Sequence, residues 1–377
     1  MKNKTRIPLL EPDLGENELK YLSKCISDNW ISSAGPFVEE FEKKIAAYAE
    51  CKFSVATANA TSGLYLSLVV AGVRPGDYVI VPDWTFSATA NAVLMAGAIP
   101  YFVDIDKRTW NIDVNLVEQV LSKEGEKIAA VIAVHALGHP ADMHELRETC
   151  DKFNVLVIED AAAAIGSKYY GKSVGQFGDL GVFSFNGNKI LTAGAGGMIV
   201  TNSGKWAALA KKISSQGKMG DKYNYDTVGF NFKMSNLNAA VGLAQLERLD
   251  KMIKNKHTIA EQYDKAIHSR KDLIAMPRKE EAESNCWLYS MLTASDKDAN
   301  SLINYLNKNG VEAKLFWESL SKQKLYKKYP KYLVGVTDSI DRSLVSLPSS
   351  SNLSQEELQY VISLIDSWEG KPLEASF

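Results

Sequence analysis

Between residues 52 and 200, short apolar runs rich in β-branched residues alternate with segments of helical periodicity. Five of the runs have the length of strands: FSVATA (53–58), YVIVP (78–82), IPYFVDI (99–105), IAAVIAVHA (128–136) and VLVIED (155–160). Helix-like segments lie between them, at 61–73, 89–98 and 144–153. This alternation is typical of βαβ units, because parallel neighbouring strands need a crossover connection. The sequence therefore predicts an α/β fold built on a mostly parallel sheet.

After Thr201 the pattern changes to a long helical periodicity, clearest over residues 235–267, which predicts a connecting helix. From about Ile274 a strand-like run (286–293) and two helix-like segments (299–310 and 354–370) indicate a smaller α/β region. A chain of 377 residues is too long for one ordinary core. We therefore expect a large α/β domain over residues 1–250 and a smaller C-terminal α/β domain over residues 251–377.

The charges nearly cancel, with 43 Lys and Arg against 45 Asp and Glu, and no long run of one sign is present. This balance argues against a nucleic-acid or membrane partner and favours a small-molecule ligand. The charged N-terminus, the lack of an apolar run of about 20 residues and four scattered cysteines predict a cytoplasmic chain with reduced thiols.

Three residues with candidate chemistry stand at or just after the ends of apolar runs. In open parallel sheets, ligands bind beyond the carboxyl ends of the strands, and VLVIED ends there with Glu159 and Asp160. Such a carboxylate can be a helix cap, a metal ligand or the partner of a protonated ring nitrogen. Lys189 follows on a turn after VFSF (182–185); a lysine there is usually a solvated charge, but when partly desolvated it becomes a nucleophilic amine. Together, Lys189 and Asp160 supply the Schiff-base amine and the ring-nitrogen partner that pyridoxal phosphate needs.

The phosphate and the ring of that cofactor need further contacts. Asn59, Thr61 and Ser62 lie at a predicted strand-to-helix turn, where backbone amides bind phosphate, although an ordinary N-cap explains them equally well. Trp84 and Phe86 follow the strand 78–82 and offer an aromatic face, with core packing as the alternative. The glycines at 194–198 lack the spacing of a dinucleotide-binding loop, and we interpret them as room for close packing.

His135 and His139 have the i, i+4 spacing of a metal site on a helix. The segment follows a strand and contains Gly138 and Pro140, so a helical metal site is not expected.

Eight segments, in order along the chain, resemble the DegT/DnrJ/EryC1/StrS family of sugar aminotransferases: 29–42, 58–64, 81–93, 134–143, 157–189, 194–202, 229–250 and 346–354. The resemblance covers nearly the whole chain. It implies a fold type I aminotransferase, with a large, mostly parallel, seven-stranded-type sheet domain flanked by helices and a smaller C-terminal α/β domain. It also implies pyridoxal 5'-phosphate as cofactor and no metal.

The family's functional positions can be matched one by one in this sequence. Lys189 matches the Schiff-base lysine and Asp160 the pyridinium partner, while Phe86 matches the residue that stacks on the ring. The phosphate-binding positions are matched by Thr61, Ser62, Ser184 and Asn231. In the family, the residue at the Asn231 position reaches the phosphate from the neighbouring subunit, which implies a homodimer with shared active sites.

The chain departs from the family pattern at four positions. Ala163 replaces a polar residue three positions after Asp160, Ala60 replaces a glycine, and Lys233 and Lys314 stand where arginine is common. Relatives that replace the lysine with histidine are dehydratases, so Lys189 favours amino transfer.

The resemblance implies that L-glutamate donates an amino group to a keto sugar. The subgroup most similar by eye makes GDP-perosamine, so we expect amination at C4 of a nucleotide-linked 4-keto-6-deoxyhexose, for O-antigen or another surface polysaccharide. A dTDP- or UDP-linked sugar, a non-nucleotide keto sugar such as 8-oxo-3-deoxy-octulosonate, and a non-catalytic regulator that binds the cofactor are the alternatives. Trp30, Lys314 and Trp317 are candidate sugar-nucleotide contacts, although surface or core packing also explains them.

Overall fold

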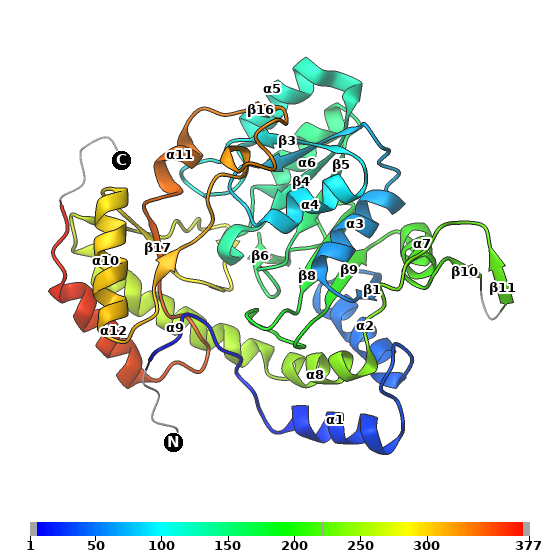
Figure 1. Cartoon of the computed structure of the whole chain (residues 1–377), viewed down its shortest axis with the longest axis horizontal. Helices are drawn as coiled ribbons and strands as arrows, with labels where there is room; N and C mark the ends of the chain where they lie inside the picture. Colours follow the sequence, from blue (N-terminus) through cyan, green and yellow to red (C-terminus); the bar gives the residue numbers. More distant parts are fainter. Residues whose placement is uncertain (1–5, 220–221, 372–377) are drawn as a thin grey trace.

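A computed structural model describes residues 6–219 and 222–371 (Figure 1). Its centre is an eight-stranded sheet in the order β1-β9-β8-β5-β4-β2-β3-β16. These strands are β1 (Phe53–Thr57), β9 (Gly197–Thr201), β8 (Leu180–Ser184), β5 (Leu156–Asp160), β4 (Ile128–Val134), β2 (Tyr78–Pro82), β3 (Ile99–Val103) and β16 (Lys331–Tyr332). Of the eight, β9 alone runs opposite to the others. The predicted α/β fold with a mostly parallel sheet is confirmed.

Helices cover both faces of this sheet because successive strand residues point to opposite sides. On β2, Val79 and Val81 pack with α3 (Ala60–Val70), α4 (Ser87–Met95) and α7 (Gly204–Ser214), whereas Ile80 packs with α5 (Val114–Glu124) and α6 (Met143–Lys152). Near β1, β8 and β9, α2 (Pro36–Tyr48) and α8 (Asn236–Leu246) cover the second face. The sheet is therefore buried on both sides, which explains its continuous apolar runs.

The eighth strand was not expected from the sequence. Strand β16 comes from the C-terminal region and pairs in parallel with β3, with Lys331 opposite Phe102. Beyond it, the buried Asp104 carboxylate accepts hydrogen bonds from the amides of residues 334–337, at the start of α11 (Val336–Ile340). Strand β16 consists only of an exposed lysine and an exposed tyrosine, which is too short for a strand pattern in the sequence. Its pairing with β3 therefore depends on contacts between residues that are far apart along the chain.

The long periodicity over residues 235–267 forms two helices, so the expectation of one continuous connecting helix was wrong. Helix α8 ends at Leu246 and α9 (Leu249–His268) begins three residues later. At the break, Arg248 bonds Asp13 with Nη2 2.8 Å from Oδ1, and Glu247 accepts a hydrogen bond from Tyr21 on α1 (Asn17–Ser27). The change in direction allows α8 to pack on α1 and α2, and α9 on the C-terminal region.

The C-terminal region is built on an antiparallel sheet in the order β12-β14-β17-β15. Its strands are β12 (Leu273–Ala275), β14 (Ser290–Thr293), β17 (Leu344–Ser346) and β15 (Lys314–Leu315), and its core also receives α9, α10 (Asp296–Lys308) and α12 (Gln355–Ser367). Ile7 packs in this core and bridges to Val311, so the N-terminal segment joins it. The division into domains at residue 250 stays a prediction.

Two small sheets complete the described chain. Strands β13 (Ala282–Glu283), β6 (Lys168–Tyr169) and β7 (Lys172–Ser173) form one of them. The other is the hairpin of β10 (Lys218–Met219) and β11 (Lys222–Tyr225), which projects from the body on the side away from α10 and α12 (Figure 1).

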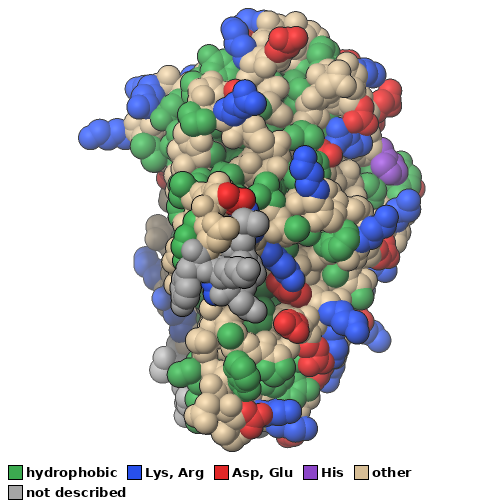
Figure 2. All heavy atoms as spheres, turned by 90° about the vertical axis from the view of Figure 1, so that its right-hand side faces the viewer, with side chains coloured by type: hydrophobic (Ala, Val, Ile, Leu, Met, Phe, Trp, Pro, Cys, Tyr) green, Lys and Arg blue, Asp and Glu red, His purple; other side chains and the backbone are tan. Residues whose placement is uncertain are grey.

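On the face that carries this hairpin, basic and acidic side chains are interspersed (Figure 2). None of the helices in the described ranges is long and apolar enough to cross a lipid bilayer.

Candidate active site

A cavity of about 480 Å³ lies beyond the carboxyl ends of the large sheet's strands. Its walls come from both regions of the chain. The region of the large sheet, with its helices and loops, contributes Thr61, Phe86, Asp160, Ser184 and Lys189. The C-terminal region contributes Trp287, Lys314, Phe316 and Trp317. Five of the seven predicted site residues are therefore brought together, although their roles toward a cofactor remain predictions.

Lys189 lies on the turn after β8, where its amide donates to the carbonyl of Asn186 (3.0 Å). Its Nζ is 3.9 Å from the centroid of the Trp287 ring. Burial in the cavity wall lowers the pKa of Lys189 to about 8, against the opposing attraction of Asp160. A large fraction of this amine is therefore neutral near pH 8, which is the form that acts as a nucleophile or accepts a proton.

Asp160 ends β5 and its carboxylate is held by two donors. Thr89 Oγ1 donates to Oδ2 (2.7 Å), and the amide of Ala162 donates to Oδ1 (3.2 Å). Burial raises the pKa of Asp160, while these hydrogen bonds and the nearby Lys189 favour the charged form. Asp160 is thus a buried carboxyl group in the wall of the cavity that contains Lys189, and its pKa is raised by burial.

Glu159, the other carboxylate at this strand end, has a structural environment. It points away from Asp160, as adjacent strand residues do, and accepts hydrogen bonds from the amides of Gly175 (2.7 Å) and Gly178 (2.6 Å). It also bonds Nε2 of His135 (2.9 Å). Glu159 therefore anchors the loop before β8.

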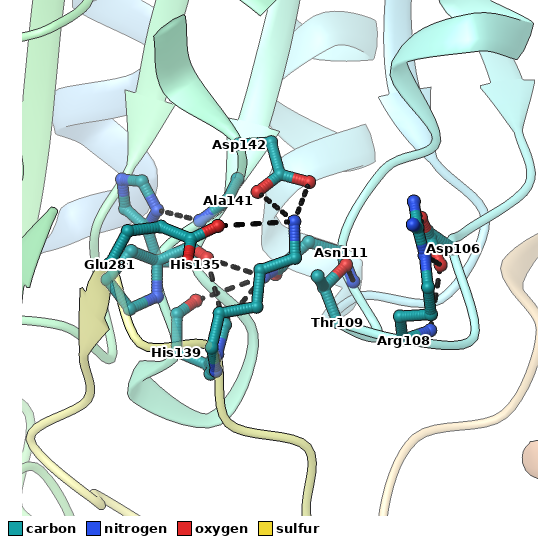
Figure 3. A network of polar contacts seen from close by, with 11 residues as sticks. Asp106, Arg108, Thr109, Asn111, His135, His139, Ala141, Asp142 and Glu281 are labelled. Atoms are coloured by element: carbon teal, nitrogen blue, oxygen red, sulfur yellow. Dashed lines mark hydrogen bonds and ion pairs between the residues drawn. The ribbon is translucent and has the colours of Figure 1, made fainter. Parts of the chain in front are cut away.

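The two histidines belong to one polar network, in which His135 also lines the cavity (Figure 3). His135 Nδ1 accepts from the amide of Ala141 (3.0 Å), so Nε2 carries the hydrogen donated to Glu159. His139 Nδ1 donates to the carbonyl of Pro140 (2.8 Å), and burial lowers the pKa of His139 to about 4. Within residues 6–219 and 222–371, no group of three or more His, Cys, Asp and Glu could hold a metal ion.

The start of α3 lies at one end of the cavity. Asn59 is its N-cap, with Oδ1 accepting from the amide of Ser62 (2.8 Å), so the N-cap interpretation is correct. Thr61 lines the cavity, while the buried Ser62 is not among its lining residues.

A Cβ on Gly197 would lie 2.6 Å from the backbone nitrogen of Ala60, so only glycine lets β9 pass this close to the start of α3. The prediction of close packing is thus confirmed for Gly197 and for Gly196, where a Cβ would lie 2.6 Å from Met234, but it is wrong for Gly194, which has no such neighbour and a φ of 75°.

The two aromatic candidates after β2 have different environments. Phe86 lines the cavity and is 60% exposed, as a ring-stacking residue would need to be. Trp84 is buried in a cluster with Trp110 and Trp317, so core packing is correct for it.

Asn231 is exposed and lies outside the cavity formed by the described residues of its own chain. It bridges to Ser215, close to the projecting hairpin. Trp30 is also exposed and outside the cavity, whereas Lys314 and Trp317 line it.

Sequence reasoning missed two aromatic residues of the site, Trp287 and Phe316. Trp287 lies in a run predicted as a strand, but β14 begins only at Ser290, and Cys286 adopts a left-handed conformation with φ of 52°. The run 286–293 carried no signal that Trp287 would turn toward Lys189.

The family model for the DegT/DnrJ/EryC1/StrS aminotransferases matches residues 12–366. The chain belongs to this family. It is therefore an aminotransferase, and its cofactor is pyridoxal phosphate.

Relatives of this aminotransferase match it over almost their whole length. GDP-perosamine synthase of Escherichia coli O157:H7 is 36% identical over 96% of this chain and 98% of its own. GDP-perosamine synthase of Vibrio cholerae is 36% identical over 96% and 99%. The crystal structure of a DegT DnrJ EryC1 StrS aminotransferase from Brucella abortus superposes with a TM-score of 0.89 at 29% identity, over 94% of this chain and 96% of that one.

The residues of the cavity fit this cofactor. Lys189 supplies an amine whose pKa is lowered by burial, and the buried Asp160 supplies a carboxyl group in the same cavity. Phe86 presents an exposed ring. Asn59, Ala60 and Thr61 place the start of α3 in the cavity wall, and a phosphate is stabilised by a helix N-terminus.

Proposed function

We propose that this aminotransferase transfers the amino group of L-glutamate to a keto sugar, at C4 of a nucleotide-linked 4-keto-6-deoxyhexose. The observation that carries the proposal is the cavity that contains Lys189 and Asp160 and extends to Lys314 and Trp317 of the C-terminal region. The identity of 36% with two GDP-perosamine synthases supports the class of sugar. A spore coat polysaccharide biosynthesis protein of Bacillus subtilis, 33% identical over 78% of this chain, supports a role in surface polysaccharides.

When bound, pyridoxal phosphate supplies an electron sink for the carbon that loses or gains a proton. The protein residues do the rest. In its neutral form, Lys189 Nζ would accept the proton from the α-carbon of the donor, and the ammonium that results would return a proton from the same side of the site. The Asp160 carboxylate would stabilise the protonated ring nitrogen of the cofactor. Thr89 orients that carboxylate through its hydrogen bond.

The substrate end of the cavity is lined by Lys314, Phe316 and Trp317. In the proposal, the Lys314 ammonium attracts the phosphates of the sugar nucleotide, and the two aromatic rings exclude water from one wall. The proposal includes a homodimer in which Asn231 of each protomer reaches the cofactor phosphate of its partner. The cytoplasmic location stays a prediction from the sequence.

The test has two steps, both followed by the visible absorbance of the lysine-bound cofactor. L-glutamate should remove this absorbance from the purified enzyme, and the correct keto sugar should restore it. The sugar panel contains GDP-, dTDP- and UDP-linked 4-keto-6-deoxyhexoses and one non-nucleotide keto sugar, with Lys189→Ala as the control that should respond to none of them.

Each outcome of this test has a definite meaning. Recovery with a GDP-linked sugar but not with the others supports the GDP-perosamine-like reaction. Recovery only with the non-nucleotide sugar would replace the proposed substrate. A wild-type enzyme that binds the cofactor but does not respond to glutamate would support a regulator; a pleiotropic regulatory protein of Geobacillus stearothermophilus is 31% identical over 95% of this chain.

A further inference from the structure

Trp287 makes two contacts with the loop that carries the reactive lysine. Its ring faces Lys189, with Nζ 3.9 Å from the ring centroid, and its Nε1 donates to the carbonyl of Asn188 (2.7 Å). The side chain is 2% exposed and lines the cavity. One residue of the C-terminal region thus contacts both the backbone and the amine of the lysine loop.

Asn285 fixes the backbone from which this indole projects. It is completely buried, and its Nδ2 donates to the carbonyls of Ala163 (3.0 Å) and Ile165 (2.9 Å), just after Asp160. Its Oδ1 accepts from the amide of Trp287 (2.9 Å). A Cβ on Gly138 would lie 2.0 Å from this Oδ1, so a glycine at 138 is needed for the fit. The Asp160 segment and Trp287 are therefore joined through one amide side chain.

Lys256 on α9 fixes the other side of the same residue. It is 3% exposed, and its Nζ donates to the carbonyl of Trp287 (3.0 Å) and to the carbonyl of Ser349. The charged or titratable groups that face it are Cys286 and Asp13. Burying an amine has a large desolvation cost, which the two hydrogen bonds to backbone carbonyls offset. The carbonyls of Trp287 and Ser349 are therefore held in fixed positions around Lys256.

We propose that Trp287 is a positioning residue for Lys189: its indole face holds Nζ in the cavity and stabilises the ammonium form, while Asn285 and Lys256 hold the indole in place. The inference rests on the proposed role of Lys189 as the reactive amine. The contact with Trp287 opposes the effect of burial on Lys189, because burial favours the neutral amine whereas an aromatic face favours the ammonium form.

The surroundings make this contact effective. Asp160 is the charged group that faces Lys189, and Lys314 lines the same cavity. Ala163, packed in the same apolar cluster as Trp287, adds no polar side chain to this wall. The protonation of Lys189 therefore depends on burial, one carboxylate and one aromatic ring.

The test measures the protonation of Lys189 without substrate. The full chain, freed of cofactor, is labelled with a trace of acetic anhydride across a range of pH, and mass spectrometry follows the peptide that contains Lys189. In Trp287→Leu the apparent pKa of Lys189 should fall by about one pH unit, which corresponds to acetylation about fivefold faster at pH 7. Trp287→Phe keeps an aromatic face and should stay close to wild type in this titration.

The matched control is Trp368→Phe. Trp368 is also a buried tryptophan near a cation, Arg270, 5.9 Å from its ring, but it lies outside the cavity lining, so its replacement should leave the Lys189 titration unchanged. Equal pKa values for Lys189 in wild type and Trp287→Leu would overturn the proposal. So would a Phe variant that behaves like the Leu variant.

If Trp287→Leu does not fold, the chain can be made with fluorinated tryptophans, which keep the shape of the ring and weaken its negative face. The pKa of Lys189 should then fall as fluorines are added, and a constant value would exclude the cation–π contact. Because no substrate is used, a chain that failed to aminate any sugar would still give a clear result.

Discussion

At the scale of single residues, the site depends on how its surroundings change the pKa values of Lys189 and Asp160. Burial lowers the pKa of Lys189 and raises that of Asp160, so both groups are moved toward neutrality. Their mutual attraction and the hydrogen bond from Thr89 act against that effect. Such opposed shifts in one cavity are typical of catalytic groups.

Replacing Asp160 with asparagine should leave the shape of the site and remove its negative charge. We expect the first half-reaction with glutamate to slow by about 10²-fold or more, as for the loss of one strong electrostatic contact in an active site. Single-turnover absorbance after mixing with glutamate measures this rate. A variant with unchanged rate and unchanged thermal stability would contradict the role of Asp160.

The pH dependence of cofactor capture should report the protonation of Lys189. Its pKa is lowered from 10.5 to about 8, and only the neutral amine attacks an aldehyde, so the rate of pyridoxal phosphate capture should rise with pH around a midpoint near 8. Since the Asp160 charge raises the pKa of Lys189, Asp160→Asn should move the midpoint to lower pH. Stopped-flow absorbance at several pH values checks both statements; a midpoint above 10 would show that the amine is not desolvated.

At the scale of elements, the contact between Asp104 and the start of α11 ties the C-terminal region to the large sheet. The buried carboxylate accepts from the amides of Ile105, Val334, Gly335, Val336 and Thr337 and from the Thr337 hydroxyl, at 2.6–3.0 Å. Burial opposes ionisation, but these donors outweigh it and hold the pKa of Asp104 below its ordinary value. This anion complements the helix start and fixes strand β16 at the sheet edge.

Asp104→Asn should lower the free energy of unfolding by about 3 kcal/mol at pH 7, because an amide cannot accept from all of these donors. Because the pKa of Asp104 is lower in the folded state, its ionised carboxylate stabilises the fold fully above the unfolded-state pKa near 3.9. This stabilisation is lost as the pH falls through the folded-state pKa. Urea unfolding should therefore show that the difference between wild type and variant begins to shrink below about pH 4 and closes only as the pH falls through the lowered folded-state pKa of Asp104.

The matched control is Asp106→Asn. Asp106 pairs with Arg108, whose side chain is 70% exposed, so its loss should cost about 1 kcal/mol or less. Equal losses for the two variants would contradict the special role of Asp104.

At the scale of the whole molecule, the cavity needs both regions of the chain, and the proposed phosphate contact of Asn231 needs a second copy. Asn231 is exposed, bridges to Ser215 shortly before strand β10, and lies outside the cavity formed by the described residues of its own chain. In a two-fold dimer each protomer presents the same surface to its partner, so one such contact would occur at both sites.

Mixing two inactive variants tests the shared site. Heterodimers of Lys189→Ala and Asn231→Asp would contain one intact site each, so remixing equal amounts should restore about a quarter of wild-type activity. As a control, mixing Lys189→Ala with Asp160→Asn should restore none, because Lys189 and Asp160 belong to the same cavity of one chain. No recovery in the first mixture, with dimers present by light scattering, would exclude the shared site.

The sequence by itself determined the parallel sheet and the place of the reactive pair. The alternation of strand-like and helix-like segments is a local pattern that can be read directly from the sequence. Because the carboxyl ends of parallel strands lie at one edge of the sheet, Asp160 and Lys189 could be expected to lie close together. The break between α8 and α9, the edge strand β16 and the indole of Trp287 beside Lys189 were decided only by the tertiary structure. Each depends on side chains that are distant along the chain and meet only when the two regions pack, and periodicity contains no information about such contacts.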